Sequence, residues 1–174
     1  MAKKEIKKPA KKTNFESKVI DRMDKIITLL KPEISGAVAK SPSVTVQVKK
    51  DERFIDNNDG TILDMETSLM WAKEGSSKEL NFADAEKYCK DSKIGGFKDW
   101  RLPTVKELIS IVDYEKYRPA INPVFKCESS WYWSGSSYAD GADSAWVVYF
   151  GSGGVSWYGG SGGNYVRPVR QYLK

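Results

Sequence analysis

Between residues 129 and 165 the side chains are suited to molecular contact more than to bond-making chemistry. Of these 37 residues, 27 are Ser, Gly, Tyr or Trp, and none is Lys, Arg, Glu or Pro. Tyr and Trp offer a large contact area at a small entropic cost, while Ser and Gly offer adaptable hydrogen bonding. An apolar run at residues 145–150 argues against a Gly/Ser linker. We therefore expect a recognition surface supported by strands.

Residue types that serve catalysis are scarce. The sequence contains no histidine, which removes the most common general base and the most common metal ligand. Cys89 and Cys127 are the two cysteines, too few for a four-thiolate zinc site, and we expect free thiols. We predict that the protein is not an enzyme, with no catalytic residue, no cofactor and no metal.

A group of acidic and amide residues superficially resembles a calcium loop. It comprises Asp56, Asn58, Asp59 and Asp64. Its spacing is one residue short of the D-x-N-x-D-G pattern, so the metal signal is weak. Asn58-Asp59-Gly60 is instead typical of a tight turn, and we interpret these residues as turn formers.

Charge is concentrated at the N-terminus. Residues 1–12 hold six Lys and one Glu, which accounts for the whole net charge of +5 and leaves 22 basic and 22 acidic residues elsewhere. Such a tail is typical of a disordered, solubilising extension, and the neutral remainder predicts no specific nucleic-acid partner. No apolar run approaches the roughly 18 residues of a membrane span. The basic start lacks the apolar core of a signal peptide, so we favour a cytoplasmic or virion-associated location over classical secretion.

Residues 13–43 are predicted to form a helix followed by a linker. Ile20, Met23, Ile27 and Leu30 have a heptad spacing, and Pro32 ends the helix. This segment is either a homo-oligomerising coil at residues 13–31, or a helix that packs on the body or acts as a spacer. The pattern does not choose between these alternatives.

The main domain is predicted at residues 44–174 with α+β order. Alternating valines predict a short strand at 44–48, and residues 53–72 predict a hairpin with a second turn at 64–68. A helix capped by Asn81 should end near Ser92, and a second should begin after Pro103 with a Thr104/Glu107 capping box. Further strands are expected at residues 130–134, 145–150, 154–158 and 164–170, which gives a mainly antiparallel β C-terminal half.

Seven segments in this order point to a known family. They read RFIDNNDGTILDMETSLMWAK, FADAEKYC, GGFKDWRLPTVKELISIVDY, INPVF, YWSGSSYA, AWVVYFGSGGV and YVRPVR. Over about residues 53–170 the sequence resembles the Lcl C-terminal domain family, which is related to the C-type lectin fold and to formylglycine-generating-enzyme-like domains. The resemblance implies a C-type lectin fold.

A lectin-type fold that ends in a Ser/Gly/Tyr/Trp-rich segment is also similar to the variable proteins of diversity-generating retroelements. In that case residues 130–170 are a hypervariable segment, and the partner is a protein or cell-surface ligand of unknown identity. Alternate strand residues would stay in the core as scaffold, namely Trp133, Trp146, Val148, Phe150, Val155 and Val166. The displayed, ligand-binding residues would be Tyr138, Asp140, Asp143, Tyr149, Ser152, Ser156, Trp157, Tyr158, Ser161 and Asn164.

The sequence departs from the patterns of these families. Family members often end in Y-V-R-C-V-R, whose Cys can pair with the one in the first helix, but here position 168 is Pro. The sugar-coordinating triplets of calcium-dependent lectins are absent as well, so sugar binding by that mechanism is not expected. Two alternatives stay open: an adhesin or virion component with a fixed surface, and an enzyme of the formylglycine-generating type.

Two arginine-containing segments are predicted to hold the fold together. Arg101 in Trp100-Arg101-Leu102-Pro103 is placed to pin a loop by bidentate pairing with a carboxylate. Arg167 and Arg170 lie on opposite faces of the last predicted strand, so they cannot line one flat patch and are interpreted as structural. For Trp131 and Trp157, burial and exposure are both open.

Overall fold

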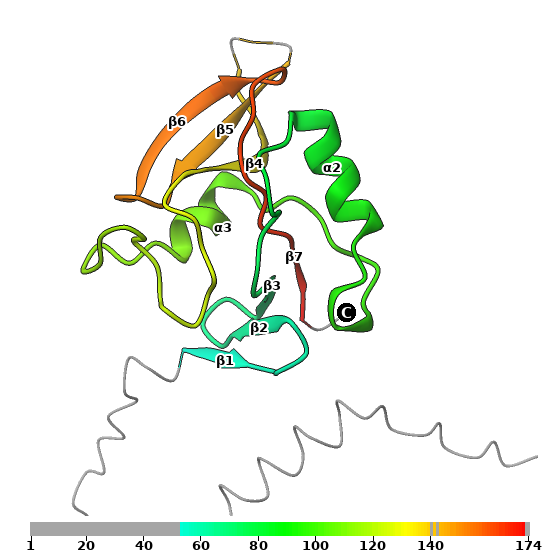
Figure 1. The fold of residues 1–174 in the computed structure, drawn as a ribbon, viewed down its shortest axis with the longest axis vertical. Coiled ribbons are helices and arrows are strands. Elements are labelled where there is room, and N and C mark those ends of the chain that lie inside the picture. Colours follow the sequence, from blue (N-terminus) through cyan, green and yellow to red (C-terminus); the bar gives the residue numbers. More distant parts are fainter. Residues whose placement is uncertain (1–52, 140, 142, 173–174) are drawn as a thin grey trace, which may run out of the picture. The chain divides into compact units, whose positions relative to one another are not determined.

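Two antiparallel sheets and two α-helices make up the described chain, which confirms the predicted α+β class (Figure 1). The structure is a computed structural model, and it describes residues 53–172 with the exception of 140 and 142. The expectations for the basic tail at 1–12, the helix at 13–31, its linker and the strand at 44–48 lie outside these residues. The same holds for Asp140.

The first sheet is built from the predicted hairpins and the end of the chain. Strands β1 (Phe54–Asp56), β2 (Thr61–Asp64), β3 (Leu69–Ala72) and β7 (Val169–Gln171) are ordered β1-β2-β3-β7. The first turn takes the backbone through positive φ at Asn58 (59°) and Gly60 (87°), which Asn and Gly tolerate best. Asp59 Oδ1 accepts hydrogen bonds from the Thr61 N–H at 3.0 Å and from its hydroxyl at 2.6 Å. Turn chemistry therefore explains this acidic group, as predicted.

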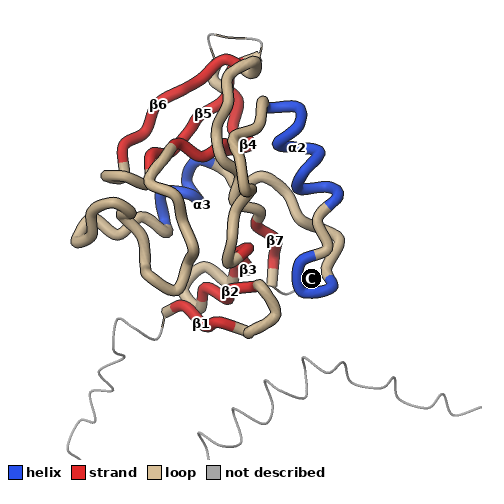
Figure 2. The backbone as a smooth tube through the Cα atoms, in the orientation of Figure 1, coloured by secondary structure: helices blue, strands red, loops and turns tan. Residues whose placement is uncertain are grey.

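The second sheet carries the Ser/Gly/Tyr/Trp-rich segment. It contains β4 (Trp131–Ser137), β5 (Ser144–Tyr149) and β6 (Gly154–Gly159) in that order. Residues 150–153 connect β5 to β6, and Gly153 has a φ of 83°. A Cβ at Gly153 would lie 2.6 Å from Cε1 of Tyr114, so this position needs glycine for space as well as for conformation. Figure 2 shows β6 as the outermost strand of this sheet.

The predicted strand at 164–170 is wrong over most of its length, because only Val169–Gln171 joins a sheet. Residues before β7 instead form isolated bridges, Asn164 with Leu80 and Tyr165 with Tyr132. The segment crosses from the second sheet to the first and changes partner on the way. Pro168 has no N–H, and its carbonyl accepts from Ala72 N–H at 2.9 Å.

Both predicted helices are confirmed with their caps. Helix α2 (Phe82–Asp91) begins after Asn81, whose side chain accepts from the Asp84 N–H at 2.9 Å, and Ser92 is its C-cap. Helix α3 (Val105–Ser110) begins with the complete Thr104/Glu107 capping box. A short 3₁₀ helix, η3 (Ile94–Gly96), lies between them in the sequence.

The second sheet is covered on both faces. Tyr132, Val148 and Phe150 pack in a cluster with Leu108 of α3, and this cluster continues to Trp71 and Val169 of the first sheet. Trp133, Ala145 and Val147 pack in a second cluster with Ala85 and Cys89 of α2. Because adjacent strand residues point to opposite faces, α3 and α2 lie on opposite sides of this sheet.

The three arginines have the predicted structural roles. Arg101 forms a bidentate pair with Glu107, at 2.8 and 2.7 Å, inside the capping box of α3. Arg170 pairs with Asp99, with Nε to Oδ1 at 2.7 Å. Arg167 is fully buried and donates to the carbonyl oxygens of Ala72, Lys73 and Lys126 at 2.7 to 2.9 Å.

Candidate ligand-binding surface

Strand register divides the predicted display residues between two faces of the second sheet. Trp157 on β6 lies opposite Trp146 on β5, whereas Tyr158 lies opposite Ala145. Neighbouring residues on a strand point to opposite faces, so Trp157 is on the α3 side and Tyr158 is on the α2 side. The structure therefore does not bring the predicted residues together into one flat patch.

The α3 side carries an aromatic group that we call the Trp157 cluster, formed by Tyr138, Trp146 and Trp157. The rings of Tyr138 and Trp157 are stacked, with centroids 4.8 Å apart and planes inclined by 5°. Tyr138 meets Trp146 edge to face at 5.2 Å. Trp157 is 49% exposed although its ring is held in this stack. The cluster thus presents a large aromatic side chain in a fixed orientation.

The α2 side carries a second group, the Tyr158 cluster, formed by Trp131, Tyr149 and Tyr158. Trp131 lies 5.0 Å from the ring of Tyr149 and 5.9 Å from that of Tyr158. Tyr158 is 37% exposed, while Trp131 and Tyr149 are half-buried. Trp131 and Trp146 were not among the predicted contact residues. Trp131 lies opposite Tyr149 and Trp146 lies opposite Trp157, so the strand register would have been needed to predict both.

The other predicted display residues have different environments. Asp143, Ser152 and Ser161 are exposed, and Ser156 is half-buried. Asn164 is an incorrect prediction, because only 1% of its surface is accessible and its backbone pairs with Leu80 in both directions. The terminal segment turns inward toward the start of α2 at this residue, so its side chain cannot be displayed.

The predicted scaffold residues are confirmed except at two positions. Trp133, Val148, Phe150 and Val166 are each fully buried. Val155 is 43% exposed, against expectation, because β6 is the edge strand and lies beyond the cover that α3 gives to β4 and β5. Trp146 is half-buried and belongs to the Trp157 cluster.

The segment that supplies both clusters is almost without charge. Between residues 129 and 165 the sequence has two charged residues, Asp140 and Asp143. Recognition here would rest on shape, apolar contact and hydrogen bonds more than on ion pairs. This composition is typical of contact surfaces.

The acidic residues near the first turn are engaged in the fold. Asp56 pairs with Lys73 at 2.6 Å, and Asp64 pairs with Arg53 at 2.7 Å. Burial raises the pKa of Asp64, but hydrogen bonds from Arg53, Thr67 and the Glu66 N–H outweigh it and leave that pKa below its usual value. Among the described residues, no cluster of three or more His, Cys, Asp or Glu side chains is arranged to hold a metal ion.

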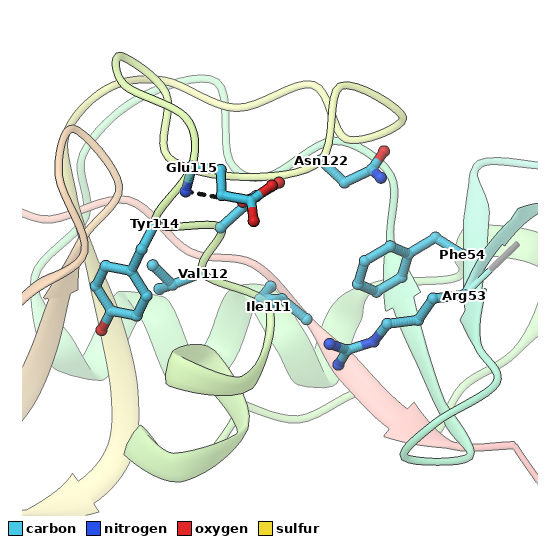
Figure 3. A pocket seen from close by; sticks show the side chains of 8 residues that line it. Arg53, Phe54, Ile111, Val112, Tyr114, Glu115 and Asn122 are labelled. Atoms are coloured by element: carbon cyan, nitrogen blue, oxygen red, sulfur yellow. Dashed lines mark hydrogen bonds between the residues drawn. The ribbon is translucent and has the colours of Figure 1, made fainter. Parts of the chain in front are cut away.

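A hollow of about 320 Å³ lies away from both aromatic clusters (Figure 3). Phe54, Ile111 and Val112 supply its apolar lining, and Arg53 and Glu115 stand at its edge. The guanidinium of Arg53 already pairs with Asp64 and Glu66, at 2.7 and 2.9 Å. None of the predicted site residues lines this hollow, so we do not assign the function to it.

The two cysteines are free thiols, as expected. Cys89 faces the second core cluster and is 1% exposed. Burial raises the pKa of its thiol to about 12, which suppresses the reactive thiolate. Cys127 is half-buried beside the hydroxyl of Tyr132, at 3.4 Å.

None of the helices within residues 53–172, gaps at 140 and 142 aside, is long and apolar enough to cross a membrane. No curated protein matches the sequence. The model of one family, the Lcl C-terminal domain, matches residues 60–170. The match begins after β1 and includes strands β2 to β6, most of β7, both α-helices and both aromatic clusters, and it covers more than half of the sequence. The chain therefore belongs to the Lcl C-terminal domain family.

Proposed function

We propose that this protein is a ligand-binding protein of the receptor or adhesion type, and not an enzyme. Its contact surface is the exposed part of the Trp157 cluster, with the Tyr158 cluster as a second site on the other face. The single observation that carries this proposal is the stack of Tyr138 on a half-exposed Trp157. Trp and Tyr are enriched among the interface residues that dominate binding energy.

Pre-organisation supports this assignment. A free Trp side chain loses conformational entropy when a ligand fixes it, whereas the Trp157 ring is already held by Tyr138 at 4.8 Å. The conformational entropy of the Trp157 side chain is therefore already lost on folding, and binding need not reduce it further. The scarcity of charged residues within 129–165 favours a partner with an apolar or neutral polar face, such as a protein or another cell-surface molecule.

We further propose that the scaffold is of the C-type lectin type and that its terminal segment is diversified by a retroelement. The contrast between buried positions such as Trp133 and Phe150 and exposed ones such as Trp157 supports this proposal. A scaffold of this kind tolerates changes on its accessible strand residues while the core residues stay constant.

The test of diversification is the DNA sequence around the gene. A near-copy of the segment that encodes residues 130–170, next to a reverse transcriptase gene and differing at template adenines, would support the proposal. The differing codons would then name the contact residues. If no second copy exists, the domain is a binding protein with a fixed surface.

The test of binding uses point variants of the full chain. A ligand can be sought by probing glycan arrays and arrays of cell-surface proteins, and the Trp157→Ala protein should lose the signals of the unmodified protein. Tyr117→Ala is the matched control, since Tyr117 is 68% exposed and lies outside both clusters. Equal loss in both variants, or loss in neither, contradicts the assignment of the Trp157 cluster.

A further inference from the structure

We infer that the outer edge of β6 is a self-association surface on which a second copy of this chain adds its own β6 in antiparallel orientation. Two three-stranded sheets would then join into one. The inference is independent of the proposed ligand, because it concerns the backbone edge of the strand and not the exposed aromatic faces.

The hydrogen-bond alternation assigns the free edge to two residues. The N–H of Gly160 donates to the carbonyl of Asp143 at 2.5 Å, so by alternation Tyr158, Ser156 and Gly154 direct their backbone groups toward β5. Gly159 at the end of β6 turns its backbone groups away from β5, and its carbonyl accepts from the Gly162 N–H at 2.9 Å. The backbone groups of Val155 and Trp157 point away from the sheet in the same way. Neither residue has a hydrogen bond on that side within the part of the chain that the structure describes.

Nothing in the sequence of β6 blocks this edge. Natural proteins protect exposed edge strands with charged side chains, proline or bulges. Residues 154–159 read GVSWYG, and the pairing of β6 with β5 is regular over the whole strand. Without charged side chains, two copies can meet with no like-charge repulsion.

The aromatic side chains of β6 also leave the edge open. Trp157 leans inward onto Tyr138, and Tyr158 leans inward toward Trp131 of β4. Both rings therefore cover the sheet and not its border. Figure 1 shows β6 on the outside of the sheet, with β5 between it and β4.

One antiparallel register makes this strand complementary to itself. With the twofold axis at Ser156, Val155 of one copy lies opposite Trp157 of the other, and the two exchange N–H···O bonds on either side of the axis. The cross-strand pairs are then Val with Trp, Ser with Ser and Gly154 with Tyr158. Hydroxyl pairs across strands are favourable, and no pair in this register places like charges opposite each other.

The first experiment measures the mass of the full chain by light scattering over a concentration series without ligand. We expect a monomer–dimer equilibrium. Val155→Pro should raise the dimer dissociation constant about thirtyfold, since symmetry removes the donor twice. The Val155 N–H does not bond to β5, so the melting temperature should stay unchanged.

A second pair of variants tests the register. Across the axis the Ser156 Cα atoms would be about 4.5 Å apart, within the range that a disulfide spans. Under mild oxidation Ser156→Cys should form a covalent dimer. Ser152→Cys, an exposed site in the β5–β6 connection, is the control and should not, because it lies far from the axis.

A chain that is monomeric at every concentration would overturn the inference. A dimer would also overturn the inference if Val155→Pro leaves its mass unchanged and Ser156→Cys does not cross-link it. Another segment, such as residues 13–31, would then hold that dimer together. If Val155→Pro does not fold, the cysteine pair alone decides. Loss of ligand binding in Trp157→Ala with an intact dimer would separate this surface from the binding face.

Discussion

The rings of Tyr138 and Trp157 stack with their centroids 4.8 Å apart and their planes inclined by 5°. The contact joins the residue that follows β4 to the edge strand β6 across β5. It keeps the most exposed tryptophan that the structure describes in one orientation. The stability of the fold, its dependence on pH and the reactivity of its thiols are expected to depend on local contacts of this kind.

The first prediction concerns the stability of the Trp157 cluster. Trp157→Ala should reduce the free energy of unfolding by about 0.5–1.5 kcal/mol, the usual value of an aromatic pair. Trp133→Ala should reduce it by about 3–5 kcal/mol, since Trp133 is fully buried. Urea unfolding of both variants measures the difference. Equal losses would mean that Trp157 is part of the core and not a displayed side chain.

The second prediction concerns acid stability. Burial raises the pKa of Glu107, but its bonds to Arg101 and Thr104 outweigh burial and lower that pKa overall, and the pKa of Asp64 is lowered likewise. A carboxyl with a lowered native pKa stabilises the fold fully above its unfolded value of about 4, and this contribution is lost as the pH falls toward the native value. The free energy of unfolding should therefore decrease below about pH 4.

Denaturant titrations at a series of pH values measure this decrease, and Asp64→Asn should make the slope shallower because it removes one of the responsible groups. Glu115→Gln is a control, since Glu115 lies outside both ion pairs. A free energy that stays constant down to about pH 3 would show that these ion pairs add no net stability.

The third prediction concerns the buried Arg167. Its guanidinium donates hydrogen bonds to the carbonyl oxygens of Ala72, Lys73 and Lys126. It also lies over the rings of Phe125 and Tyr132, at 5.3 and 5.6 Å from their centroids. Lys cannot reproduce this planar fork, so Arg167→Lys should destabilise the protein by about 2 kcal/mol or more, through buried carbonyls left without a donor. Chemical denaturation measures the loss, with the exposed Arg118→Lys as control. If Arg167→Lys leaves the free energy of unfolding unchanged, water replaces the lost hydrogen bonds.

The fourth prediction concerns thiol reactivity. The Cys89 thiol is buried and its pKa is raised to about 12, so it should resist alkylation in the native protein at neutral pH. Adding denaturant should expose it and bring its alkylation to the rate of a free cysteine. Mass spectrometry of the peptide that contains Cys89 follows both states. Rapid modification of the native protein would mean that α2 opens readily from the sheet.

Much of the fold could be predicted from local sequence. Asn58-Asp59-Gly60 fixed the first turn, Asn81 and Thr104 marked the helix starts, and the apolar run 145–150 marked β5 within a residue. These features depend on backbone conformation and on hydrogen bonds between near neighbours, which the residue types determine directly. The composition of residues 129–165 predicted the contact surface that we propose, with four of its six aromatic members, Tyr138, Tyr149, Trp157 and Tyr158.

Which residues reach solvent was decided by the tertiary structure. Alternation separates the side chains of a strand into two sets, but it does not say which elements cover each set. Val155 is exposed because β6 lies at the edge, and Asn164 is buried because the chain turns toward Leu80. The division of the aromatic residues into the Trp157 and Tyr158 clusters follows from the register of β4, β5 and β6. Register and cover depend on contacts between residues far apart in the sequence, which no local pattern contains.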